Sequence, residues 1–66
     1  MNRDRLHAAT MGARERTGKL VATAVKGGLW QVQTIVYQER PRKTVVTPLS
    51  GWMDGSKVVS FLEGLK

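Results

Sequence analysis

The side chains of this sequence best suited to bind another molecule are its cations. Of the 66 residues, 11 are Lys or Arg and 5 are Asp or Glu, which gives a formal net charge of +6 at pH 7. The cations gather in an N-terminal group and in a group around Pro41; they are Arg3, Arg5, Arg14 and Arg16, and Arg40, Arg42 and Lys43. This balance favours polyanions, namely nucleic acid, an acidic protein or anionic lipid. Charge that serves solubility alone is the alternative interpretation.

The residue types that catalysis requires form no recognisable group. The single histidine, His7, lies in the N-terminal segment, away from any predicted partner. No carboxylates are spaced to share a metal or a sugar, and no serine has a base beside it. Cysteine is absent, which excludes disulfides and thiolate metal sites. We therefore expect no enzyme, no metal site and no cofactor.

Three antiparallel strands are predicted between residues 19 and 49. Gly27-Gly28 suits a two-residue hairpin turn, because both residues can adopt positive φ, and Lys26 then faces Leu29. A four-residue loop over 39–42 makes Gln38 face Lys43. Both registers place the same apolar set on one face, which we expect to be covered; it comprises Val21, Thr23, Val25, Trp30, Val32, Thr34, Val36, Val45, Thr47 and Leu49.

The opposite face is smaller in side-chain volume and more polar. It carries Ala22, Ala24, Gln31, Gln33, Ile35, Tyr37, Thr44 and Val46. Pro48 cannot donate a main-chain hydrogen bond, so the third strand is expected at the sheet edge there.

One helix is predicted after the sheet and a second segment is left open before it. Asp54 is a good N-cap, and an apolar stripe follows at helical spacing, formed by Val58, Phe61, Leu62 and Leu65. We expect Phe61 and Leu62 to pack on Trp30, Val32 and Val45, since so short a helix does not persist alone. Residues 1–17, with Asn2 as a possible cap, are either a short helix with Leu6, Ala9 and Ala13 on one side or a mobile basic arm.

The sequence thus predicts an α+β fold: a basic N-terminal segment over 1–17 and a single β-β-β-α domain over 18–66. No apolar run approaches the length of a membrane helix, and no signal peptide is recognisable. We expect a cytoplasmic protein.

The order of motifs after Gly28 resembles a known family. The run G-L-W-Q-V-Q-T-I-V-Y is followed by the basic turn R-P-R-K, then by Gly51-Trp52, and then by K-V-V-S-F-L-E-G-L. This pattern, over roughly the last forty residues, is similar to the small DNA-binding domains at the N-terminus of tyrosine integrases and to AP2 domains. The phenylalanine-threonine that usually precedes the helix in that family is replaced by Gly51-Trp52-Met53. No catalytic integrase segment follows, so we do not expect recombination.

The resemblance implies that the open sheet face lies in the major groove of DNA, with the helix behind it. Gln31, Gln33, Tyr37 and Thr44 would then face bases, and the basic turn would contact phosphate. The candidate nucleic-acid contacts are Arg3, Arg5, Arg14, Arg16, Lys19, Gln31, Gln33, Tyr37, Arg40, Arg42, Lys43 and Thr44.

Two functions are compatible with these observations. The first is a small accessory or regulatory protein of phage or plasmid type that binds duplex DNA, with RNA left open as the nucleic acid. The second is an interaction module that docks an acidic host protein through its basic surface or an edge strand.

Overall fold

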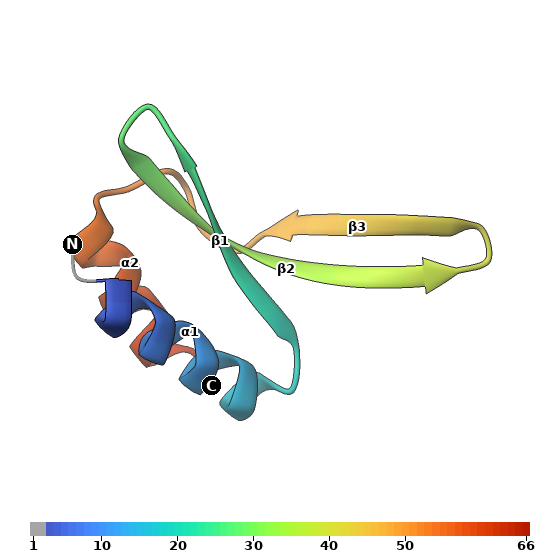
Figure 1. Cartoon of the computed structure of the whole chain (residues 1–66), viewed down its shortest axis with the longest axis horizontal. Helices are drawn as coiled ribbons and strands as arrows, with labels where there is room; N and C mark the ends of the chain where they lie inside the picture. The colour runs from blue at the N-terminus through green and yellow to red at the C-terminus, as the bar shows by residue number, and fades with distance from the viewer. Residues whose placement is uncertain (1–2) are drawn as a thin grey trace.

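A three-stranded antiparallel sheet with two helices on one of its faces forms the α+β fold of this chain (Figure 1). The computed structural model describes residues 3–66. Its elements are α1 (Arg3–Thr17), β1 (Leu20–Lys26), β2 (Leu29–Glu39), β3 (Arg42–Pro48) and α2 (Gly55–Gly64). The strand order is β1-β2-β3, so β2 is central and β3 is an edge, as Pro48 predicted. Within residues 3–66, neither helix has the length and apolarity needed to cross a membrane.

Both predicted hairpin registers are confirmed. Lys26 pairs with Leu29, and the two turn glycines adopt φ of 57° and 78°, values that a side chain would disfavour. Gln38 pairs with Lys43 in the second hairpin. The ladder continues one pair beyond the prediction, to Glu39 and Arg42, so the tip of the second hairpin consists of Arg40 and Pro41 alone.

The N-terminal segment is a helix rather than a mobile arm. The 15-residue helix α1 buries Ala9 and Ala13, two of the three residues predicted for its apolar side. It contacts α2 and β1, and therefore shares one core with the rest of the chain. Asn2, the possible cap, lies outside the described residues.

The core lies between the two helices and the part of the sheet nearest to them. Its buried members are Ala9, Ala13, Val21, Val32, Val58, Val59 and Leu62. Val58 and Leu62 confirm the predicted stripe of α2, whereas Phe61 and Leu65 are only partly buried. Val59 was not part of that stripe; it is buried because α1 lies against α2.

The helices cover only part of the sheet face predicted to be buried. They contact β1 and β2 but not β3, and the hairpin of β2 and β3 projects beyond them (Figure 1). Val25 is 58% exposed, Val36 53% and Leu49 40%, and Thr47 is exposed as well, contrary to the expectation that all four are covered. The predicted packing of α2 on Val45 is wrong, because α2 does not contact β3. The reason is length: the ten residues of α2 span about 15 Å, whereas the eleven of β2 span about 36 Å.

This packing predicts which substitution in α2 is the more destabilising. Leu62 is fully buried and Phe61 is not. Leu62→Ala should therefore lower the free energy of unfolding by about 2–5 kcal/mol, comparable with the roughly 3–5 kcal/mol that a core of this size supplies. Phe61→Ala should lower the free energy of unfolding by clearly less than Leu62→Ala does. Urea unfolding followed by circular dichroism measures both, and an equal or larger loss for Phe61→Ala would contradict the packing.

Candidate nucleic-acid interface

The sheet face away from the helices is open, and it gathers all four residues predicted to read bases. Side chains alternate along each strand, so Gln31, Gln33 and Tyr37 lie on this face of β2. Thr44 pairs with Tyr37 across β3 and lies on the same face. Tyr37 is 69% exposed, which leaves its ring and hydroxyl available to a ligand.

The two glutamines act as one unit. Nε2 of Gln33 donates a hydrogen bond of 2.9 Å to Oε1 of Gln31, and both side chains are half-buried. This bond leaves the amide N–H groups of Gln31 and the amide oxygen of Gln33 as a neighbouring donor and acceptor. An adenine edge in the major groove presents the complementary pair, an N7 acceptor and an N6 donor.

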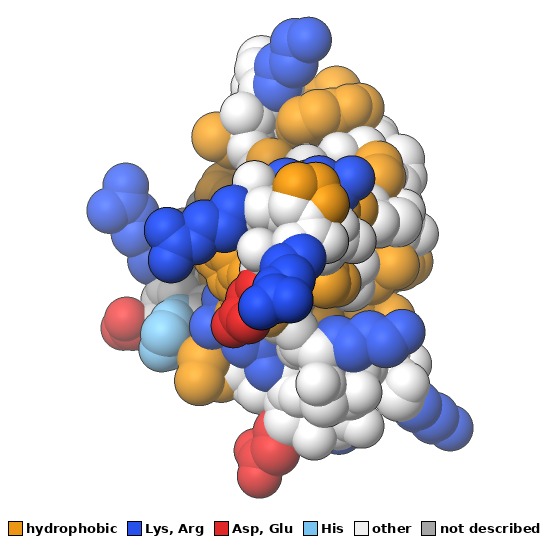
Figure 2. Space-filling model, turned by 90° about the vertical axis from the view of Figure 1, so that its right-hand side faces the viewer, with side chains coloured by type: hydrophobic (Ala, Val, Ile, Leu, Met, Phe, Trp, Pro, Cys, Tyr) orange, Lys and Arg blue, Asp and Glu red, His pale blue; other side chains and the backbone are white. Residues whose placement is uncertain are grey.

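The cations of the second hairpin are exposed but do not share one face. Arg42 pairs with Glu39 and lies on the open face, whereas Lys43 pairs with Gln38 and lies on the helix side. Arg40 is at the tip. Seen end-on toward the tip, Lys and Arg side chains project around the molecule in several directions (Figure 2).

Lys26 belongs to the open face and was missed among the candidate contacts. It is exposed at the end of β1, two residues beyond Ala24, on the same side of the strand. The register already predicted from Gly27-Gly28 contained this signal, because alternation places residues 22, 24 and 26 together. The open face therefore carries a cation at each end, Lys26 and Arg42.

Two of the predicted N-terminal contacts hold the fold together. Nε of Arg14 donates to the main-chain oxygen of Val21 at 2.7 Å. Arg16 donates from Nη2 to the oxygen of Leu62 at 2.6 Å and from Nε to that of Leu65 at 2.7 Å. Arg16 thus adds a second donor to the oxygen of Leu62, which also accepts the N–H of Leu65, and bonds the oxygen of the C-cap Leu65, at the end of the helix that attracts cations.

The remaining predicted contacts also lie away from the open face. Arg3 and Arg5 belong to the first turns of α1, in the helix layer. Lys19 precedes β1 and lines a hollow on the helix side together with Val21 and Leu49. The structure therefore groups Gln31, Gln33, Tyr37, Thr44 and Arg42, and separates them from the N-terminal arginines. Lys19 also lines a second hollow, together with Ile35 and Tyr37.

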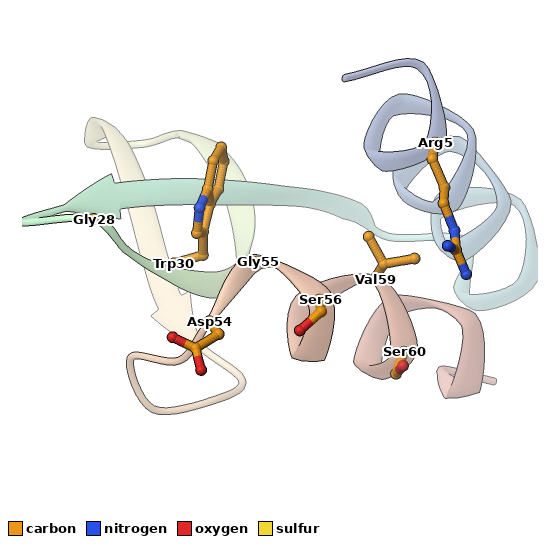
Figure 3. Close-up of a pocket in the computed structure, with 8 residues that line it drawn as sticks. All are labelled: Arg5, Gly28, Trp30, Asp54, Gly55, Ser56, Val59 and Ser60. Carbon is orange, nitrogen blue, oxygen red and sulfur yellow. The ribbon is translucent and has the colours of Figure 1, made fainter. Parts of the chain in front are cut away.

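A third hollow lies at the N-terminus of α2, between that helix, α1 and Trp30 (Figure 3). Asp54 and Arg5 stand at its opposite ends, with Ser56, Val59 and Ser60 along α2 between them. Asp54 is the N-cap as predicted, but its side chain makes no capping hydrogen bond. No group of three His, Cys, Asp or Glu side chains able to hold a metal occurs in residues 3–66.

Comparisons with known proteins give no information on the family or function of this chain. No protein family, curated protein or solved structure matches the chain. The similarity to integrase and AP2 domains therefore stays a prediction from motif order.

The contacts of Arg16 predict a structural role that can be measured without any ligand. Arg16→Ala should lower the free energy of unfolding by about 1–2 kcal/mol, because two charged hydrogen bonds are lost and the oxygen of Leu62 keeps only the N–H of Leu65. Arg16→Lys should retain only part of the stability that Arg16→Ala loses, since an ammonium lacks the planar fork of donors of a guanidinium. Arg3→Ala, on the exposed first turn of α1, is the control and should change stability by less than about 0.5 kcal/mol. Equal effects of Arg16→Ala and Arg3→Ala would refute the role.

Proposed function

We propose that this protein binds duplex DNA, with the open face of the sheet and the projecting hairpin in the major groove. The observation that carries the proposal is a helix-free sheet face that continues into an exposed two-stranded ribbon. Its base-facing residues would be Gln31, Gln33, Tyr37 and Thr44, with Arg40 at the tip and Arg42 at the adjoining start of β3.

The dimensions support this arrangement. The major groove is about 12 Å wide and admits a two-stranded ribbon, whose strands are about 4.8 Å apart. Beyond Val36 the ribbon of β2 and β3 has no helix beside it, so both of its sides can enter a groove. The helix layer stays on the outer side, away from the bases.

The positions of the cations constrain the orientation. Lys26 lies opposite Leu29 and Arg42 opposite Glu39, so ten residue steps of β2, about 33 Å, separate the two ends. Both cations reach phosphates only if β2 runs along the groove rather than across it. In that orientation the glutamine pair lies between them, where it can contact base edges.

Duplex DNA fits this surface better than double-stranded RNA. The major groove of A-form RNA is deep and narrow, and side chains cannot read it. The similarity to integrase and AP2 domains adds support for DNA and for an accessory or regulatory role of phage or plasmid type. In this proposal α1 contributes little to binding, because Arg14 and Arg16 already bond to the protein.

The salt dependence of binding tests the proposal. If three or four phosphates are neutralised, log K should fall with log salt at a slope of roughly −3. Lys26→Ala and Arg42→Ala should each flatten the slope by about one unit. Lys57→Ala is the matched control, because Lys57 is also an exposed cation but lies on α2. Fluorescence anisotropy with a labelled duplex measures all four proteins.

Base reading requires a separate measurement. A preferred site is first selected from random duplexes, and Gln31→Ala is then compared with the wild type on that site and on unrelated DNA. We expect a loss of about 1–3 kcal/mol in preference with no change of slope. The proposal fails if wild-type binding is insensitive to salt, or if Lys57→Ala flattens the slope as much as Arg42→Ala does.

A further inference from the structure

The central strand β2 is longer than either of its neighbours, and each end lacks a strand on one side. β1 pairs with residues 29–35 of β2, and β3 pairs with residues 33–39. The main-chain groups on the unaccompanied side of each end need other partners, because strand N–H and C=O groups are strong hydrogen-bonding groups.

The end of β2 near Trp30 is closed by the loop after β3. The N–H and C=O of Trp30 both bond to Met53, at 2.7 and 2.8 Å. The N–H of Val32 donates to Oγ of Ser50, and its oxygen accepts from the N–H of Leu49. The even-numbered residues of β2 therefore direct their main-chain groups toward the β3 side.

The other end is open on the β1 side. In an antiparallel ladder alternate residues face opposite neighbours, so the N–H and C=O of Tyr37 face the β1 side. β1 begins only at Leu20, and the chain turns away at Gly18, whose N–H bonds to the oxygen of Arg14. Within residues 3–66 no strand lies beside Tyr37 on that side. We name this stretch, Tyr37–Glu39, the half-edge.

A hollow lies beside the half-edge, where β1 stops and β2 continues. Its lining consists of Gly18, Lys19, Leu20, Thr34, Ile35, Val36 and Tyr37. The lining is mostly apolar, and Val36 is 53% exposed in it. A side chain from a segment lying along the half-edge can enter this hollow.

We propose that the half-edge receives an extended, acidic segment of a partner protein, which continues the line of β1. The main-chain groups of Tyr37 select an extended backbone, as in recognition by strand addition. The hollow selects an apolar side chain on one side of that segment. Lys19 in the hollow and Arg40 at the tip favour acidic residues in the remainder, and Glu39 is the one acid in the half-edge itself.

A second copy of this chain is a poorer occupant. Each copy carries a formal charge of +6, and pairing through the half-edge would bring together the cationic hairpin tips of two copies. The inference does not depend on DNA binding, because neither the half-edge nor the hollow includes the glutamine pair. A test without DNA therefore fails or succeeds independently of the proposed function.

The probe is an eight-residue synthetic peptide in which valine alternates with glutamate, and its control carries lysine in place of glutamate. Amide hydrogen exchange of the ¹⁵N-labelled wild type is followed by NMR, without any mutation. At a peptide concentration about ten times Kd, exchange at Tyr37 should slow about tenfold. Thr44 and Val46, whose main-chain groups face outward on β3, should be unchanged. The lysine peptide should bind at least about tenfold more weakly.

A pair of variants separates the main chain from the side chain. Tyr37→Ala keeps the N–H of the half-edge and Tyr37→Pro removes it, without touching a bond to β3. The peptide should bind about fivefold more weakly to Tyr37→Pro than to Tyr37→Ala. The proposal is overturned by protection at Thr44 and Val46 instead, by no binding at millimolar peptide, or by preference for the lysine peptide. If the protein dimerises without peptide and amide exchange at Tyr37 is slowed in the dimer, the half-edge binds a second copy of the chain instead.

Discussion

The contact between the two helices and the near part of the sheet is the interaction on which the rest of the molecule depends. A helix of ten residues does not persist alone in water, and neither does a two-stranded hairpin. Val21 and Val32 of the sheet and Leu62 of α2 are fully buried against one another, with α1 closing the side of α2 through Ala9 and Ala13. Each element is therefore stable only in the presence of the others.

The shortness of the helices relative to β2 then divides the molecule into two parts. The near part of the sheet is core, and the far part is a ribbon held by cross-strand pairs alone. The ribbon keeps its register because the near part is anchored, and its side chains remain exposed because no helix reaches it. The same mismatch of lengths produces both the projecting open face and the half-edge.

The sequence predicted the sheet accurately because its determinants are local. Gly27-Gly28 and the alternation of side chains along the strands specified both registers. The coverage of the face could not be predicted in the same way, because the alternation shows which residues share a face but not where a helix ends above it. Exposed residues of that face were therefore expected to be covered, namely Val25, Val36, Thr47 and Leu49.

The role of α1 was harder to predict for a different reason. Alanines bury little area each, so a face of Ala9 and Ala13 gives a weak signal for packing. The bonds of Arg14 and Arg16 join residues up to 49 positions apart, and no local pattern encodes them. Among the candidate contacts, the open-face residues followed from the registers, whereas the N-terminal arginines were chosen by charge alone. The structure separates these two groups.

The edges of the sheet differ in how they are protected from pairing with other chains. Exposed edges invite pairing with other chains, and proteins commonly protect them with charges, proline or a covering segment. The outer edge of β1 carries Arg14 on the oxygen of Val21, and the near end of β2 is closed by Met53 and Ser50. β3 has Arg42 at one end and Pro48 at the other. The half-edge has a hollow beside it instead of a covering segment. A strand end that lacks a cover, in a sheet whose other edges are covered or flanked by charge and proline, is better suited to receive a partner than to exclude one.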